Sequence, residues 1–78
     1  MRVKYIGQSF YGGFGLTNGK IYECIEEKFG LLRIVDDEDE DYLYSAKAPC
    51  APDGSSAPGR WEIIEDDEKG TLAEAIGL

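Results

Sequence analysis

The segment from residue 11 to residue 22, YGGFGLTNGKIY, has the glycines and the lysine of a phosphate-binding loop. Such a loop requires G-x-x-x-x-G-K followed by Ser or Thr, and it opens a helix whose N-terminus faces the phosphate. Here Phe14 stands where the first glycine should be, Ile21 follows Lys20, and the next residues have strand-like composition. We therefore expect a turn at Asn18-Gly19 and no phosphate site.

The acidic run DDEDED at residues 36–41 is the second candidate for chemistry, because consecutive carboxylates could bind a cation. A calcium loop needs alternating ligands, a central glycine and a distal glutamate, and this run has no glycine. Adjacent strand residues also point to opposite faces, so the carboxylates would not converge on one ion. We predict a solvated acidic turn and no metal site, with weak adventitious cation binding as the open alternative.

Catalytic groups are scarce. The chain has no histidine, which removes the commonest general base and metal ligand. Cys24 and Cys50 match no zinc spacing, and Lys47 alone would activate Cys50 only weakly as a nucleophile. We predict no enzyme activity and no cofactor, with Cys24 as a small core residue, Cys50 as an exposed loop thiol, and no disulfide between them.

Net charge limits the partners. A net charge of −8 over 78 residues disfavours nucleic acid and anionic membranes, which bind through Lys and Arg, and permits a basic protein partner. The N-terminus MRVKYIGQ lacks the long apolar run of a signal peptide, and no stretch approaches the about 20 apolar residues of a membrane span. We expect a cytoplasmic protein that is a monomer or a weak homo-oligomer.

The elements that must position these residues are mostly strands. Alternating polarity and β-favouring composition predict strands at residues 2–6, 20–26, 31–36, 41–45 and 60–64. Gly30 is expected to supply the positive φ of a hairpin turn, and Trp61 to fill the core. Residues 46–59 hold all three prolines and are predicted to form a loop.

The C-terminal segment carries helix signals. Thr71 and Glu74 form a T-x-x-E pattern, which predicts a capping box at the start of a short helix. Leu72, Ala75 and Ile76 would then form an apolar stripe that packs against the strands.

Five sequence patterns, in this order, resemble those of a group of small, uncharacterised bacterial and phage-type proteins. They are Y-I-G from residue 5, L-x-x-G-K-x-Y from 16, R-I-V-D from 33, D-Y-L-Y from 41, and an aromatic residue followed by E-I-I-E from 61. The resemblance covers about residues 3–65, and the segment around Gly19-Lys20 is similar to the entry into the second strand of Src-homology-3-like barrels. It implies such a barrel and no established activity.

We therefore predict a mainly β fold, a small five-stranded antiparallel Src-homology-3-like barrel with a long first loop at residues 7–17 and a short C-terminal helix. Residues 1–65 would form the barrel, and residues 66–78 an acidic linker and the helix. The loop at 46–59 is longer than usual for the group, and the helical tail is an addition. The A-L-Y-D-Y motif and paired tryptophans of peptide-binding signalling domains are absent, so a proline-peptide groove is not implied.

Our leading hypothesis is a non-enzymatic protein-binding or adaptor module. In such barrels the long loop and neighbouring strand aromatics commonly form the ligand face, which implies Tyr11, Phe14, Tyr42 and Tyr44 here. Alternatively, one or two of Phe10, Tyr11 and Phe14 fold back over the end of the barrel. Two other functions stay open: an acidic inhibitor that mimics nucleic-acid charge through residues 36–41 and 65–68, and a structural domain that self-associates through the apolar face of its tail.

Overall fold

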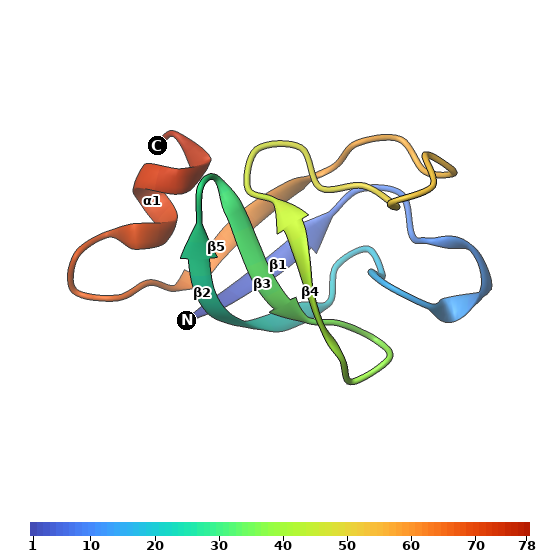
Figure 1. The fold of residues 1–78 in the computed structure, drawn as a ribbon, viewed down its shortest axis with the longest axis horizontal. Helices are drawn as coiled ribbons and strands as arrows, with labels where there is room; N and C mark the ends of the chain where they lie inside the picture. Colours follow the sequence, from blue (N-terminus) through green and yellow to red (C-terminus); the bar gives the residue numbers. More distant parts are fainter.

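The computed structural model describes residues 1–78 and confirms the mainly β class. Five antiparallel strands form one sheet in the order β4-β3-β2-β1-β5, and a short helix follows the last strand (Figure 1). The elements are β1 (Arg2–Ile6), the short 3-10 turn η1 (Tyr11–Gly13), β2 (Ile21–Lys28), β3 (Leu31–Val35), β4 (Asp41–Ser45), β5 (Arg60–Glu65) and α1 (Thr71–Ile76).

The sheet has one buried face because apolar residues alternate along its strands. The core residues that the strands contribute are Val3, Tyr5, Tyr22, Cys24, Leu32, Ile34, Tyr44 and Trp61. The predictions that Cys24 and Trp61 belong to the core are confirmed, since each is no more than 3% exposed. Tyr5 and Trp61 meet edge to face with ring centroids 5.7 Å apart, a favourable arrangement for aromatic pairs.

The strands at 2–6 and 41–45 have the predicted bounds, but β2 extends two residues further than predicted, to Lys28. The reason is that pairing with β3 continues to Lys28 and Leu31, so only Phe29 and Gly30 remain for the turn. Both turn residues have positive φ, 54° and 81°, as a two-residue hairpin turn of the favoured kind requires. The predicted role of Gly30 is therefore confirmed, and Phe29 is a non-glycine residue in the left-handed region.

Strand pairing does not close the sheet into a barrel. The edge strands β4 and β5 do not pair with each other, and the loop at residues 46–59 connects them. The indole of Trp61 bridges the two edges instead: its Nε1–H donates a hydrogen bond to the carbonyl of Ser45 at 3.0 Å.

Two loops lie together at the end of the molecule away from α1 (Figure 1). We call residues 7–20 the first loop and residues 46–59 the proline loop. The Ala57 amide donates to Oε1 of Gln8 at 3.0 Å, which ties the two loops together. Within the proline loop, the Ala51 amide donates to Oγ of the buried Ser56 and the Gly59 amide donates to the Pro49 carbonyl. The proline loop is therefore a packed part of the fold.

Helix α1 packs as predicted but begins differently. Leu72 is fully buried, and Ala75 and Ile76 pack against the core. The predicted capping box is wrong, because the helix follows Gly70 and the free amides of its first turn are bound by the preceding carboxylates: Asp66 accepts from Leu72 and Ala73, and Asp67 accepts from Thr71. No helix of the structure has the length and apolarity needed to cross a bilayer.

Candidate binding groove

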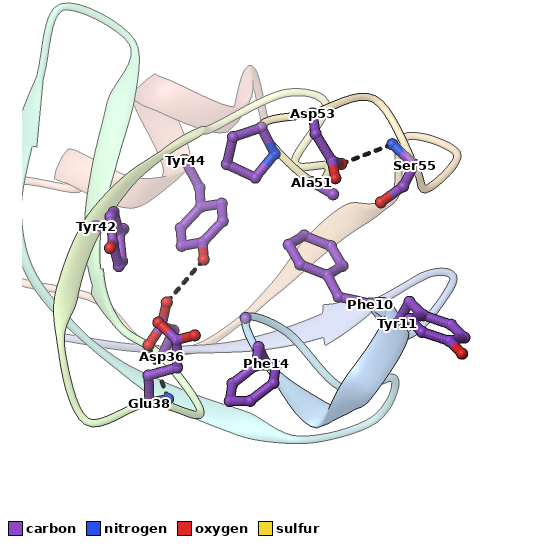
Figure 2. A pocket seen from close by; sticks show the side chains of 12 residues that line it. Phe10, Tyr11, Phe14, Asp36, Glu38, Tyr42, Tyr44, Ala51, Asp53 and Ser55 are labelled. Carbon is purple, nitrogen blue, oxygen red and sulfur yellow. Dashed lines mark hydrogen bonds between the residues drawn. The ribbon is translucent and has the colours of Figure 1, made fainter.

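A hollow of about 440 Å³ opens between the first loop, β4 and the proline loop (Figure 2). We call it the aromatic groove. Its lining residues come from the first loop, residues 36–38, β4 and the proline loop: Phe10, Tyr11, Phe14, Gly15, Asp36, Glu38, Tyr42, Tyr44, Ala51, Pro52, Asp53 and Ser55. A second hollow of about 460 Å³ beside α1 has only one apolar lining residue. Binding sites are mostly apolar with a few placed polar groups, so the aromatic groove is the better candidate.

Phe10 anchors the first loop at the wall of the groove. Its ring is buried and lies 6.0 Å from the ring of Tyr5 and 6.1 Å from that of Tyr44, measured between centroids. Gly15 passes so close to this ring that an added Cβ would lie 2.2 Å from Cδ2 of Phe10, and its φ is +87°. The loop therefore reverses direction tightly at Gly15 and leaves Tyr11 and Phe14 on its outside.

The four predicted binding residues all line the groove, but they differ in access. Tyr11 is 94% exposed, Phe14 is 62% exposed and Tyr42 is 46% exposed, whereas Tyr44 is 5% exposed. Figure 2 shows the Tyr11 ring directed outward at the edge and the Phe14 ring below the opening. Of the first-loop aromatics, Phe10 folds over the core and Tyr11 and Phe14 do not. Tyr44 is therefore part of the wall, and the other three can meet a ligand.

The acidic run does not form the uniformly solvated turn that we predicted. Asp36 is only 4% exposed, and it accepts hydrogen bonds from the hydroxyl of Tyr44 at 2.9 Å and from the Glu38 amide at 2.9 Å. The alternation that buries Leu32 and Ile34 continues one step past the end of β3, so Asp36 points to the same face. Burial, and then the hydrogen bond to Asp36, raise the pKa of Tyr44 above its ordinary value.

Asp37, the second residue of the run, also has a structural role. Its side chain is 7% exposed and accepts hydrogen bonds from Lys20 Nζ at 2.6 Å, Thr17 Oγ1 at 2.7 Å and the Tyr22 hydroxyl at 2.9 Å. Burial alone would raise the pKa of Asp37, but these hydrogen bonds outweigh it and the pKa is lowered. Burial is the main cause that raises the pKa of Tyr22 to about 12. Glu38, Asp39, Glu40 and Asp41 remain exposed as predicted.

The Asp37 contacts hold the first loop against the acidic turn, which comprises residues 36–40. The Asp37 amide also donates to the carbonyl of Gly15, the residue that follows Phe14, at 2.9 Å. The Tyr22 hydroxyl accepts from the Thr17 amide at 2.6 Å, so one cluster of hydrogen bonds joins β2, the first loop and the turn. The side of the groove formed by the first loop and the acidic turn is consequently held by hydrogen bonds as well as by packing.

Several groove residues were missed from the sequence. Phe10 was considered only for the end of the barrel, and Ala51, Pro52, Asp53 and Ser55 lie in a loop whose composition says nothing about its path. Asp53 accepts from the Ser55 amide at 2.9 Å, a local turn that shapes the rim. Only Asp36 had a usable signal, because its spacing of two from Ile34 predicts an inward side chain.

The groove offers surfaces for binding and few groups for chemistry. Its acidic side chains are Asp36, Glu38 and Asp53, and it contains no Lys or Arg. Nowhere in the chain do three or more His, Cys, Asp or Glu side chains stand where they could hold a metal ion together. Both cysteines are free and lie outside the groove: Cys50 is half-buried rather than exposed as predicted, and burial raises the pKa of Cys24 to about 11.

Comparisons of the chain with protein-family models, with curated proteins and with solved structures gave no match.

Proposed function

We propose that this protein is a non-enzymatic binding module that docks on a protein partner through the aromatic groove. The observation that supports it best is the group of three accessible aromatic side chains, Tyr11, Phe14 and Tyr42, around one concave surface. Aromatic side chains are enriched in the centres of protein interfaces, where they bury a large area. Exposure of apolar rings to water is unfavourable, so a group of exposed rings on one surface indicates an interaction site.

The rigidity of the groove walls also supports this function. Phe10, Tyr44 and Asp36 are buried and held by ring contacts and hydrogen bonds, and the first loop is tied to both the acidic turn and the proline loop. A surface that is already ordered loses less conformational entropy when a partner binds. The placement of a ligand face beside the long first loop is also what the resemblance to Src-homology-3-like barrels implies.

The alternative, an acidic mimic of nucleic acid, has fewer free carboxylates in residues 36–41 than the sequence suggested. Glu38, Asp39, Glu40 and Asp41 are exposed, but Asp36 and Asp37 are engaged within the chain. Self-association through the tail has less support, because Leu72, Ala75 and Ile76 pack against the core of the same molecule.

The test is a pull-down from a lysate of the source organism with the wild-type protein and the Tyr11→Ala/Phe14→Ala double variant. Phe29→Ala is a matched control, because Phe29 is 96% exposed at the β2–β3 turn, which does not contribute to the groove. We expect a partner that the wild type and the control retain and the double variant loses. Circular dichroism should show that all three proteins are folded.

Salt separates the proposal from the charge mimic. One result would contradict the groove proposal and favour the mimic: the Tyr11→Ala/Phe14→Ala and Phe29→Ala variants both retain the partner, and the partner dissociates between low and physiological ionic strength. A partner that the Phe29→Ala variant loses and the double variant keeps would also contradict it, and would place the contact at the hairpin turn instead.

A further inference from the structure

Asp36 is a buried carboxylate without a cationic partner. It takes part in none of the five salt bridges of the chain, although it is 4% exposed and its two oxygens accept from Tyr44 and from the Glu38 amide. Buried charges in proteins are normally paired, because removal of a carboxylate from water costs free energy that a nearby cation offsets. Hydrogen bonds from Tyr44 and from the Glu38 amide satisfy Asp36, but no cation of the chain pairs with it, so its negative charge contributes to the groove.

The other acidic residues of the groove are also unpaired with cations. Glu38 has no salt-bridge partner, and Asp53, which accepts a hydrogen bond from the Ser55 amide of its own turn, has none either. The nearest acidic neighbour along the chain, Asp37, differs because it faces away from the groove and binds Lys20. The lining thus combines three carboxylates with accessible aromatic rings and no positive charge. Figure 2 shows Asp36 and Glu38 between the rings of Tyr42 and Phe14.

We propose, on the basis of the proposed function, that the aromatic groove receives an arginine side chain from a segment of the partner protein. The guanidinium stacks on the ring of Phe14 or Tyr42 and donates hydrogen bonds to Glu38, with Asp36 behind it as a second negative charge. Faces of aromatic rings attract cations, and the carboxylates and rings of the groove are together complementary to a planar, positively charged side chain.

Arginine fits this combination better than lysine does. Its guanidinium is planar, less strongly hydrated than an ammonium, and has five donors that can bond a carboxylate while one face lies on a ring. A groove of about 440 Å³ is large enough for such a side chain together with the backbone that carries it. The net charge of −8 would also attract a basic segment from a distance.

The experiment is a titration of the full-length ¹⁵N-labelled protein with an acetylated, amidated Gly-Arg-Gly tripeptide. The matched probe is the same peptide with citrulline, which keeps the shape of arginine and removes its charge. We expect the arginine peptide to shift the amide signals of Gly15, Glu38 and Ser55, and the citrulline peptide to bind at least about tenfold more weakly. A lysine peptide should bind more weakly than the arginine peptide.

Two protein variants with equal charge changes complete the test. Glu38→Gln removes the rim carboxylate, and Glu68→Gln removes an exposed carboxylate that makes no hydrogen bond or salt bridge and does not line the groove. Only Glu38→Gln should weaken the arginine peptide, by about threefold or more at constant ionic strength. Equal binding of the arginine and citrulline peptides, equal effects of the two variants, or no shift of groove signals up to about 20 mM peptide would overturn the proposal.

Failure of this inference is distinguishable from failure of the proposed function. If the arginine peptide does not bind but Tyr11→Ala/Phe14→Ala still abolishes retention of the natural partner, the groove is a docking site for another chemistry. If both results are negative, the groove is not the binding face.

Discussion

The hydrogen-bond cluster at Asp37 leads to a quantitative prediction for stability. The substitution Asp37→Asn keeps the size of the side chain but removes its charge and one of its two acceptor oxygens. The side chain is 7% exposed and accepts from Lys20, Thr17 and Tyr22. We expect the variant to fold and to be less stable than the wild type at pH 7.

The expected loss is about 2 kcal/mol. A hydrogen bond to a charged group contributes about 1.5–3 kcal/mol, but the side chain of Lys20 is 54% exposed, so solvent screens its part. Asparagine also keeps one acceptor. Because a small domain has an m-value of about 1 kcal/mol per M of urea, the midpoint of urea unfolding should fall by about 2 M.

The loss should depend on pH in a defined direction. The folded-state pKa of Asp37 is lowered from the ordinary value of 3.8, so its contribution to stability is fully present above that value. The contribution is lost as the pH falls through the folded-state pKa, because the unfolded chain then binds a proton more readily than the folded one. The difference between wild type and Asp37→Asn should therefore be largest at pH 7 and should shrink near about pH 3.

The assay is urea unfolding followed by the fluorescence of Trp61, at both pH values. Asp39→Asn is the control, because Asp39 is exposed, makes no side-chain hydrogen bond, and has a φ of 59° that asparagine tolerates. Its effect should stay within about 0.5 kcal/mol. An equal loss in both variants, or a loss at Asp37 that does not change with pH, would refute the reasoning.

Three further predictions concern single positions. Phe29→Asn should stabilise the protein by about 1 kcal/mol, because asparagine suits a φ of 54° before Gly30, and an unchanged melting temperature would show that the turn is not strained. Gly15→Ala should destabilise by about 2 kcal/mol or more by calorimetry, since its Cβ would overlap Phe10; a smaller loss would mean that the loop shifts freely. Ellman's reagent should modify Cys24 only after unfolding, because burial raises its pKa to about 11; fast labelling of a folded Cys50→Ala variant would contradict this.

Local patterns in the sequence predict most of the sheet. Leu32 and Ile34 alternate with polar or exposed neighbours, and a period of two is enough to assign a strand and its buried face. The end of β2 was harder to predict from the sequence, because it depends on the neighbouring strand. Lys28 belongs to β2 because it pairs with Leu31 of β3. Barrel closure depends in the same way on contacts between β4 and β5, which local patterns do not encode.

The candidate site was predictable in part, and the errors have one physical origin. The resemblance to Src-homology-3-like barrels implied Tyr11, Phe14, Tyr42 and Tyr44; the first three are accessible and Tyr44 is buried. The carboxylates of Asp36 and Asp66, by contrast, were assigned by composition to a solvated run and to a linker. In the structure each accepts hydrogen bonds from groups that would otherwise lack a partner. These pairings depend on the backbone conformation of the turn and of the helix start, which residue composition does not specify.

The most direct test of the groove as the binding face is a map of amide chemical-shift changes in the ¹⁵N-labelled protein upon addition of its captured partner. The account predicts that the largest changes lie at Gly15, Glu38, Tyr42 and Ser55, which come from four separate segments around the groove. Changes confined to α1 or to the exposed face of the sheet, with those four signals unmoved, would contradict it.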